Sequence, residues 1–339
     1  MTTTSRLFDG KLFEGGLFNG GIFESAGITL ASLIASLFGA GEQGGLYLPG
    51  LDTCYIDNGT TLCTAPGDLV YRVDDLSGNG NHASQGTTAL RPIYAKHPAT
   101  GVRNLLTYTQ EFSNYNWASR AVNATLTSGV SDPFGGTSAY TLTSTGTLGR
   151  ISHVGVNLTA GDVVTTSLWV KRRAGTSSVV LYDSRTISSN QTKTVTSEWT
   201  RVNVQATVDT TGVRYPGILI FDPPNAVDIF GFQFEHTNLT NYQKVVSAYD
   251  VSESGVNDAY LMLYDGVDDV MTLSNPALGS SATVARSLPV TGASILQNQT
   301  IGANYADNVT NHALILLDRN LTTAEEAMLT AYLNIKAGL

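Results

Sequence analysis

The polar stretch at residues 74–92, DDLSGNGNHASQGTTALRP, decides how this 339-residue chain is organised. Most of its residues are Gly, Asn, Ser, Thr or other types that favour turns. It offers almost no apolar side chain to bury, so we predict a surface loop. A second turn-forming stretch, LYDGVDD at residues 263–269, is its predicted structural partner although it lies far downstream.

Together these two stretches resemble the concanavalin- and laminin-G-like lectin sandwiches found in structural proteins of tailed bacteriophages. The residues between them form an insert that opens on RNLLTYTQEF at 103–112 and closes on GFQFE at 231–235 followed by Tyr242 and Gln243. This opening and closing resemble the carbohydrate-binding-module-like jelly roll common in phage tail and fibre proteins.

The resemblance implies a mainly β chain of two nested antiparallel sandwiches. Residues 46–100 and 251–339 would form the laminin-G-like sandwich, and residues 101–250 the jelly-roll insert. Alternating apolar residues support this independently, because half-buried strands have a period of two. The predicted inward faces comprise Phe230, Phe232 and Phe234; Val202, Val204 and Ala206; and Val164, Leu168 and Val170 with Thr166.

The N-terminal residues lie outside the resemblance and contain a five-residue repeat with Gly between apolar pairs. A pair every five residues fits neither helix nor strand and requires a partner surface or identical copies. The alternative is a flexible Gly-rich arm. We predict that residues 1–45 form an anchoring or oligomerisation region, with a short helix over residues 28–38 that Gly39 ends. The repeated pairs are Leu7, Phe8, Leu12, Phe13, Leu17, Phe18, Ile22 and Phe23.

At the other end, the chain predicts a buried strand over residues 313–317 and then a short C-terminal helix. Thr322 and Glu325 have the spacing of a capping box, and Gly338 is placed to end the helix. This close also resembles the terminal strand and helix of the phage lectin-like proteins.

The amino-acid composition and net charge limit the kinds of partner that the protein can bind. Charged residues make up 14% of the chain, below the usual ~25%, while 42% hydrophobic content is enough to build a core. A net charge of −9 gives no electrostatic reason to bind nucleic acid. We find no secretory signal, and the apolar run at residues 26–40 is too short and too rich in Ser, Thr and Gly to span a membrane. We therefore expect synthesis in a cytoplasm without membrane insertion, with export inside or on an assembled particle as the alternative. The phage resemblance implies that this is the cytoplasm of a bacterial host.

Cys54 and Cys63 flank a predicted two-residue type I′ turn at Asn58-Gly59. That turn pairs the two cysteines on a non-hydrogen-bonded site, where the Cα separation of ~4.5 Å permits a disulfide. The alternative is two reduced core cysteines, as is usual in a reducing compartment.

No catalytic motif is present, and we predict a non-enzyme with no required cofactor. Adjacent aspartates on a strand point to opposite faces, so they do not form the paired acids of a hydrolase. The loop oxygens can instead hold calcium if the two turn-forming stretches abut, and laminin-G-like folds often hold it. The candidate calcium ligands are Asp74, Asp75, Asn79, Asn81, Asp265 and Asp268.

Sugar binding depends on aromatic rings that pack on pyranose C–H faces, with polar groups that bind the hydroxyls. We interpret Trp169 and Trp199 as core residues of their strands. Tyr115 and Trp117, in Asn-rich sequence, are the better exposed candidates, and Tyr182 and Tyr215 are further candidates.

These features predict a virion surface protein of a tailed phage, a tail or head fibre, spike or decoration. It would attach to other virion proteins through its N-terminal region and bind host surface polysaccharide. By analogy with such appendages, we expect a homotrimer. The alternatives are a purely structural decoration without a receptor, and a polysaccharide depolymerase.

Overall fold

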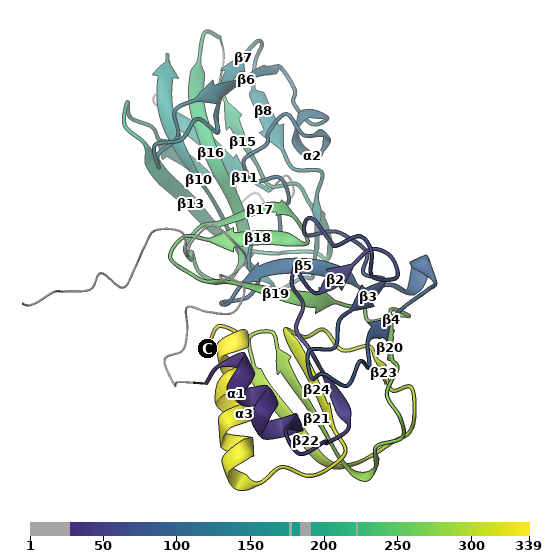
Figure 1. Cartoon of the computed structure of the whole chain (residues 1–339). Helices are drawn as coiled ribbons and strands as arrows, with labels where there is room; N and C mark the ends of the chain where they lie inside the picture. The colour runs from purple at the N-terminus through teal and green to yellow at the C-terminus, as the bar shows by residue number, and fades with distance from the viewer. Residues whose placement is uncertain (1–27, 176–177, 184–190, 222) are drawn as a thin grey trace, which may run out of the picture. The chain divides into compact units, whose positions relative to one another are not determined.

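The computed structural model describes residues 28–175, 178–183, 191–221 and 223–339. These residues form a mainly β fold with several antiparallel sheets and a short C-terminal helix, as predicted (Figure 1). The chain divides into two compact units. Unit 1 comprises Met1–Gly101 and Asn257–Leu339, and unit 2, inserted between them in sequence, comprises Val102–Val256.

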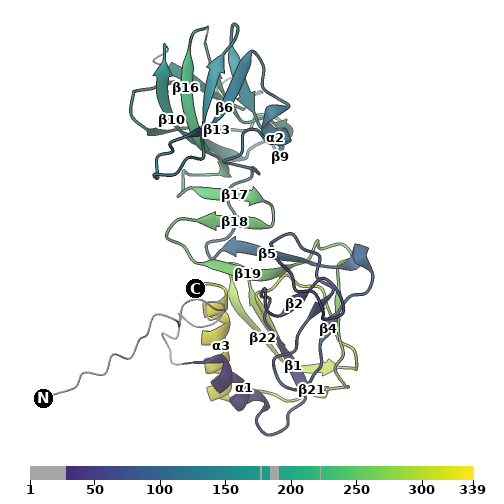
Figure 2. The same cartoon turned by 45° about the horizontal axis from the view of Figure 1, so that its top comes forward.

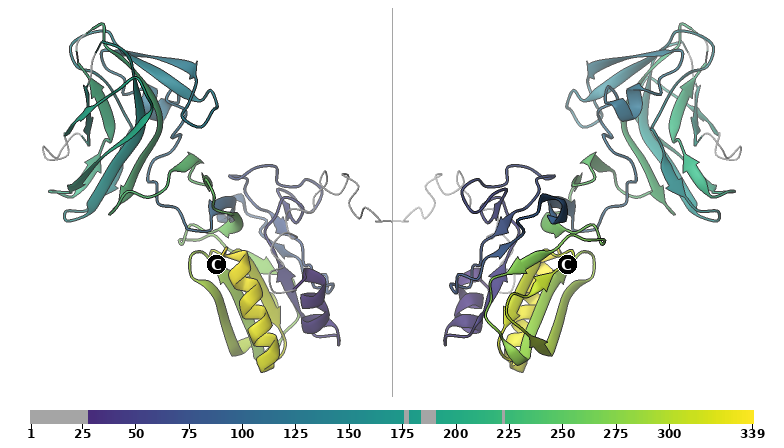
Figure 3. Two further views of the ribbon diagram at one scale, coloured as in Figure 1. Left: turned by 90° about the vertical axis from the view of Figure 1, so that its left-hand side faces the viewer. Right: turned by 90° about the vertical axis from the view of Figure 1, so that its right-hand side faces the viewer.

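Unit 1 contains a four-stranded antiparallel sheet with two helices against one face (Figure 3). Side chains from the helices and the sheet form a common apolar cluster, in which Leu33 and Leu37 of the first helix and Leu329 and Leu333 of the last are fully buried. The elements are, in sheet order, β1 (Gly44–Tyr47), β24 (Ala313–Leu317), β21 (Gly279–Leu288) and β22 (Gly292–Ile301), with α1 (Leu30–Phe38) and α3 (Thr323–Lys336).

The opposite face of this sheet packs against a second layer, so unit 1 is a sandwich with a helical layer outside it (Figure 2). Leu314 and Leu316 of β24 meet Met271 and Leu273 of the second layer in one core cluster. That layer contains a sheet of β2 (Cys54–Tyr55), β3 (Arg72–Val73), β4 (Ala83–Ser84), β20 (Met271–Leu273) and β23 (Ala306–Asp307), and the pair β5 (Ile93–Pro98) and β19 (Asp258–Leu263).

Local sequence explains where the helices begin and end. The side chain of Thr322 accepts a hydrogen bond from the Glu325 backbone N–H, and the Glu325 carboxylate accepts one from the backbone N–H of Thr322, which confirms the predicted capping box. Gly338 follows α3 with φ +80°, the left-handed conformation that favours glycine after a helix. Thr29 caps α1, which ends at Gly39 as predicted.

The predicted N-terminal anchor falls partly within the described chain. Residues 28–45 pack into unit 1, because α1 and β1 contribute to its core. The repeated Leu-Phe pairs of residues 7–23 lie outside the described residues. Among the helices that the structure describes, none combines the length and the apolarity required to cross a membrane.

The prediction of a surface loop at residues 74–92 is wrong for its first part, because Asp75, Ser77 and Asn81 are buried in unit 1. The Asp75 carboxylate accepts hydrogen bonds from the backbone N–H of Leu46, Ser77 and Asn81, at 2.9 Å each, and from the Ser77 hydroxyl. The Asn81 side chain donates to the Gly44 carbonyl oxygen at 2.6 Å. Polar groups can be buried at low cost when each has a hydrogen-bond partner, and these groups do. The stretch therefore fixes β1, the first strand of the chain, in its sheet.

Unit 2 is a sandwich of two antiparallel sheets. Leu142 and Leu168 from one sheet and Leu181 and Ile218 from the other share its core. The five-stranded sheet contains, in order, β13 (Thr200–Thr207), β10 (Val163–Ala174), β16 (Ala226–His236), β7 (Ala139–Ser144) and β6 (Ala124–Val130). The four-stranded sheet contains β12 (Gln191–Thr194), β11 (Ser178–Tyr182), β15 (Gly217–Ile220) and β8 (Gly149–Ser152).

Smaller elements complete unit 2. They are the helix α2 (Tyr115–Ala118), the strand pair β9 (Val156–Leu158) and β14 (Gly212–Arg214), and the hairpin β17 (Gln243–Ser247) and β18 (Asp250–Glu253).

A bulge in β16 changes the predicted orientation of one phenylalanine. The pairing with β10 shifts between Ser167 and Trp169, and Gly231 has φ +62° there. Phe232 and Phe234 therefore face the core, whereas Phe230 contacts Trp169 away from that core cluster. The prediction that all three share one face is wrong for this reason, because an extra residue inverts the alternation.

Candidate functional site

The four-stranded sheet of unit 2 presents two rows of side chains on the face away from the core. Register places Val180, Leu219 and Arg150 side by side across β11, β15 and β8. Two residues along each strand, and therefore on the same face, Tyr182, Gly217 and Ser152 form the second row. The core-facing residues between the rows are Leu181, Ile218 and Ile151.

The first row is open and the second is covered. Val180 and Leu219 are half-buried and Arg150 is exposed, so they form an accessible apolar floor with a cation at its end. Tyr182 lies directly over Gly217, since a Cβ at Gly217 would come 2.8 Å from Tyr182 Cζ. Glycine at this position therefore leaves the room that the tyrosine ring occupies.

Arg120 and Tyr215 stand beside the second row. The Arg120 guanidinium stacks on the Tyr215 ring, with Cζ 3.9 Å from the ring centroid, and its Nε donates to Ser152 Oγ at 3.1 Å. We call the surface formed by the two rows with Arg120 and Tyr215 the tyrosine–arginine face. It combines an apolar floor, aromatic rings and hydrogen-bond donors, the groups that bind polar ligands with apolar faces.

The positive charges of Arg150 and Arg120 act on the hydroxyl of Tyr182. Burial raises the pKa of Tyr182, and a hydrogen bond from Ser152 and the positive charges of Arg150 and Arg120 partly offset this rise. The residues of the two rows include no carboxylate, so the tyrosine–arginine face lacks the paired acids of a glycosidase.

Of the four residues predicted to bind glycan, the structure brings Tyr182 and Tyr215 together on this face. Tyr115 is 77% exposed, as predicted, but lies on α2 rather than in either row. Arg120, Arg150 and Ser152 were not predicted from the sequence. The alternation of β8, in which Ile151 is apolar between Arg150 and Ser152, is the pattern that could have indicated two of them.

The prediction that Trp117 is exposed is wrong, because its side chain is 0% exposed. One helical turn, capped by Asn114, rotates the indole into the core against Phe112 and Phe232. Its Nε1–H is satisfied by the carbonyl oxygen of Tyr108 at 3.0 Å. Trp117 also contacts His153, and burial lowers the pKa of that histidine to about 4.

A second aromatic group lies on the five-stranded sheet. The interpretation of Trp169 and Trp199 as core residues is wrong, because both are half-buried. Trp169 meets Phe134, Phe230 and Tyr242 in edge-to-face contacts, and the Arg201 guanidinium covers it at 4.7 Å from the ring centroid. The rings of this cluster pack mainly on one another and on Arg201, although Phe134 is 65% exposed.

The structure divides the predicted calcium ligands between two networks. Asp74 is paired with Arg72 and accepts from Tyr55, and Asp75 is saturated by the donors described above. Asn79 donates to the carbonyl oxygens of Glu42 and Gly44. Among the described residues, the carboxylates that lie close enough to share a metal ion are Asp265, Asp268 and Asp269, and this group includes neither Asp74 nor Asp75. The single calcium site predicted from both stretches is therefore not formed.

The second stretch does gather carboxylates. Single oxygens of Asp265, Asp268 and Asp269 lie within 4.8 Å of one another. Backbone N–H groups, that of Val267 first, lower the pKa of Asp265, while burial and then the charges of Asp265 and Asp268 raise that of Asp269. The donors fit calcium by type, but Asp265 Oδ1 is already used by the N–H groups of its own turn.

Cys54 and Cys63 are buried free thiols. Their pairing is confirmed, since the Cys63 N–H donates to the Cys54 carbonyl oxygen at 2.8 Å, but it is a hydrogen-bonded rather than a non-hydrogen-bonded site. The turn prediction is also wrong. Asn58 does not have the positive φ of a type I′ turn, and Asp57 organises the turn by accepting from the N–H groups of Thr60 and Thr61.

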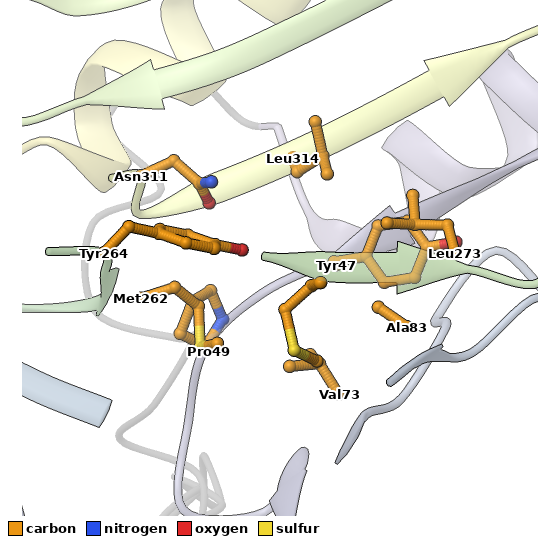
Figure 4. Close-up of a pocket in the computed structure, with 10 residues that line it drawn as sticks. Tyr47, Pro49, Val73, Ala83, Met262, Tyr264, Leu273, Asn311 and Leu314 are labelled. Atoms are coloured by element: carbon orange, nitrogen blue, oxygen red, sulfur yellow. The ribbon is translucent and has the colours of Figure 1, made fainter. Parts of the chain in front are cut away.

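Unit 1 has a small cavity in its core, lined by residues that include Met262, Tyr264, Asn311 and Leu314 (Figure 4). Its volume is about 20 Å³, which suits one water molecule. It is far smaller than a small-molecule pocket of ~300 Å³ or more. This cavity therefore has no room for a sugar.

Comparisons with known proteins give structural neighbours only. No family model and no curated protein matches the sequence. A carbohydrate-binding module from Cellvibrio mixtus lichenase 5A, in complex with cellotriose, is 14% identical, with 35% of this chain and 92% of that chain covered and a TM-score of 0.27.

Two further neighbours are of the same kind. The CBM22-1 xylan-binding domain of Paenibacillus barcinonensis Xyn10C is 16% identical, with 43% of this chain and 94% of that chain covered and a TM-score of 0.27. A family 16 carbohydrate-binding module is 19% identical, with 39% and 99% covered and a TM-score of 0.29. Likeness at this level does not carry function, which has to be argued from the side chains.

Proposed function

We propose that this protein is a non-enzymatic glycan-binding protein of a tailed-phage particle, and that it binds host surface glycan through the tyrosine–arginine face of unit 2. The observation that carries the binding proposal is the open row of Val180, Leu219 and Arg150, with the guanidinium of Arg120 stacked on Tyr215 beside the covered row. An apolar floor next to fixed donors suits a pyranose ring, which has apolar C–H faces and hydroxyls at its edge.

The virion assignment is supported by the sequence resemblance of residues 46–339 to phage surface proteins. In this proposal the Leu-Phe repeat attaches the protein to the particle or to other copies of itself, as a homotrimer. One shallow face binds weakly, but many copies on one particle bind with a combined avidity that exceeds the single-site affinity.

The test is co-sedimentation of the purified full-length protein with host surface polysaccharide, with polymer length followed in the same samples. Binding with unchanged polymer length is the expected result. The variant Tyr215→Ala removes the ring that supports Arg120 and should weaken binding about tenfold, whereas Tyr215→Phe should preserve it. Tyr249→Ala, a half-buried tyrosine in the β17–β18 turn, is the matched control.

Each other outcome contradicts part of the proposal. Shortening of the polymer would identify a depolymerase and overturn the non-enzymatic assignment. No binding to host polysaccharide, together with retention on particles stripped of it, would identify a purely structural decoration.

A further inference from the structure

The tyrosine–arginine face contains two arginines that have no carboxylate partner among the described residues. Several arginines elsewhere in the described chain are paired with acids, as Arg103 with Glu253 at 2.8 Å and Arg319 with Glu325 at 2.7 Å. Others are not: Arg91 and Arg201 donate to backbone carbonyl oxygens, and Arg172 is exposed. A chain of net charge −9 has more acidic than basic residues available for such pairs. What Arg120 and Arg150 share is their position, because both lie on one sheet face beside its rows of apolar and aromatic side chains.

Two protein contacts fix the side chain of Arg120 and leave part of its guanidinium unused. Stacking on Tyr215 fixes the plane of its guanidinium, and Nε is used by Ser152. Nη1 and Nη2 have no protein acceptor among the described residues. A guanidinium fixed in this way presents its donors as a fork, which matches the two oxygens of a carboxylate.

Arg150 supplies the second cation. It stands at the end of the apolar row, next to Leu219 on β15 and to Ser152 two residues along β8. Its guanidinium is exposed and makes no side-chain hydrogen bond with the described residues. A sugar ring placed on Val180 and Leu219 would have its edge beside this charge.

We propose that the ligand of the tyrosine–arginine face is an anionic glycan, whose acidic groups are bound by Arg120 and Arg150. This inference rests on the proposed glycan-binding function and adds the chemical class of the sugar. A carboxylate, a sulfate or a phosphate on the sugar provides the shared chemistry, which is a set of anionic oxygens that accept from arginine.

Charge density distinguishes an acidic glycan from a nucleic acid. Nucleic-acid binding depends on many phosphate contacts, because every nucleotide carries a charge. This face offers two arginines in a chain of net charge −9, which suits a polymer with sparser acidic groups. At physiological salt, charges interact over ~8 Å, so the local arginines dominate over the distant acidic surface.

The experiment measures binding of the full-length protein to matched polymers by biolayer interferometry. Polygalacturonate is compared with its carboxyl-reduced form, and dextran sulfate with dextran, so that the two sources of negative charge are separated. An oligothymidylate serves as the nucleic-acid arm. We expect at least tenfold tighter binding to one charged polymer than to its neutral partner, with affinity that falls as salt is raised.

Variants assign the effect to the face. Arg150→Ala should weaken binding to the charged polymer about tenfold, and by a larger factor than it weakens binding to the neutral partner. Arg150→Lys should recover part of the loss, because the charge is kept and the fork is not. Arg172→Ala removes an exposed arginine from β10 and is the matched control, expected to be unchanged.

The outcomes separate this inference from the function on which it rests. Equal binding to charged and neutral polymers, or a charge preference that Arg150→Ala does not reduce, overturns the inference and leaves glycan binding intact. Oligothymidylate binding as tight as that of the charged polymer also overturns it. Binding to no glycan, charged or neutral, overturns the proposed function itself.

Discussion

Asn104 and Gln243, 139 positions apart, join the opening and the closing of unit 2. The Asn104 backbone N–H donates to Gln243 Oε1 at 3.1 Å, and its side-chain amide donates to the Gln243 carbonyl oxygen at 3.0 Å. Both residues are buried. The same two positions lie in the sequence motifs that resemble phage jelly rolls, so these motifs hold the ends of the insert together.

Replacement of Asn104 by alanine should therefore destabilise unit 2. It leaves the Phe232 and Gln243 carbonyl oxygens without their donor, and buried groups without partners cost ~1–3 kcal/mol each. We expect the free energy of unfolding to fall by about 2–4 kcal/mol in urea titrations. Asn203→Ala, on an exposed position of β13, should change it by less than about 0.5 kcal/mol. Similar effects from both variants would contradict this role.

Asp75→Ala should destabilise unit 1 and not the glycan-binding face. The change removes the acceptor of four hydrogen bonds that fix the loop against β1. We expect a loss of about 2–4 kcal/mol from urea unfolding followed by probes in unit 1. Asp52→Asn, an exposed aspartate of the same unit, provides the control. Loss of glycan binding by a folded Asp75→Ala protein would show that the binding site is not confined to unit 2.

Stability should decrease in mild acid because of His153. Burial lowers its pKa from 6.5 to about 4, so between these values the unfolded chain binds a proton that the folded chain does not. The free energy of unfolding is therefore unaffected by this histidine above pH 6.5, and it decreases as the pH falls from 6.5 toward 4. The full decrease is on the order of 3 kcal/mol.

Denaturation curves of the wild type and of His153→Gln, taken from pH 7.5 to 4, test this dependence. The variant should lose less stability than the wild type across this range, whereas His236→Gln, an exposed histidine, should follow the wild type. His312 contributes with the same sign, because burial lowers its pKa also. Identical pH slopes for the wild type and His153→Gln would contradict the assignment.

The two cysteines should not react in the folded protein. Burial is the main cause that raises the pKa of both Cys54 and Cys63 to about 12, so almost no thiolate is present at neutral pH. Titration with a chromogenic disulfide reagent at pH 7.5 should label neither residue within an hour, and both once denaturant is added. Rapid labelling without denaturant would show that the hairpin opens or that the thiols are accessible.

Sequence patterns predicted those elements whose signals are local. The capping box at Thr322, the helix from Leu30 and the buried strand ending at Leu317 follow from adjacent residues. Phe230 and Trp117 were misplaced because a bulge at Gly231 and one short helical turn invert the local pattern. The burial of the loop at Asp75 could not be predicted, because its contact with β1 through the Leu46 N–H is made between residues far apart in the sequence.

The candidate face was predicted only in part for the same reason. Tyr182 and Tyr215 were found as tyrosines of the insert, without any indication that they are neighbours. Arg120 acquires its role from stacking on Tyr215, a contact between residues far apart in the sequence. Arg150 becomes informative only when strand register sets it beside Leu219.

The most direct test of glycan binding by this face is protection of its arginines. The full-length protein is modified with phenylglyoxal in the presence and absence of saturating host polysaccharide, and each arginine is followed by peptide mass spectrometry. Glycan binding should slow the modification of Arg150 and Arg120 at least fivefold and leave Arg172 unchanged. Bound polysaccharide that leaves Arg150 and Arg120 as reactive as in the free protein would contradict the account.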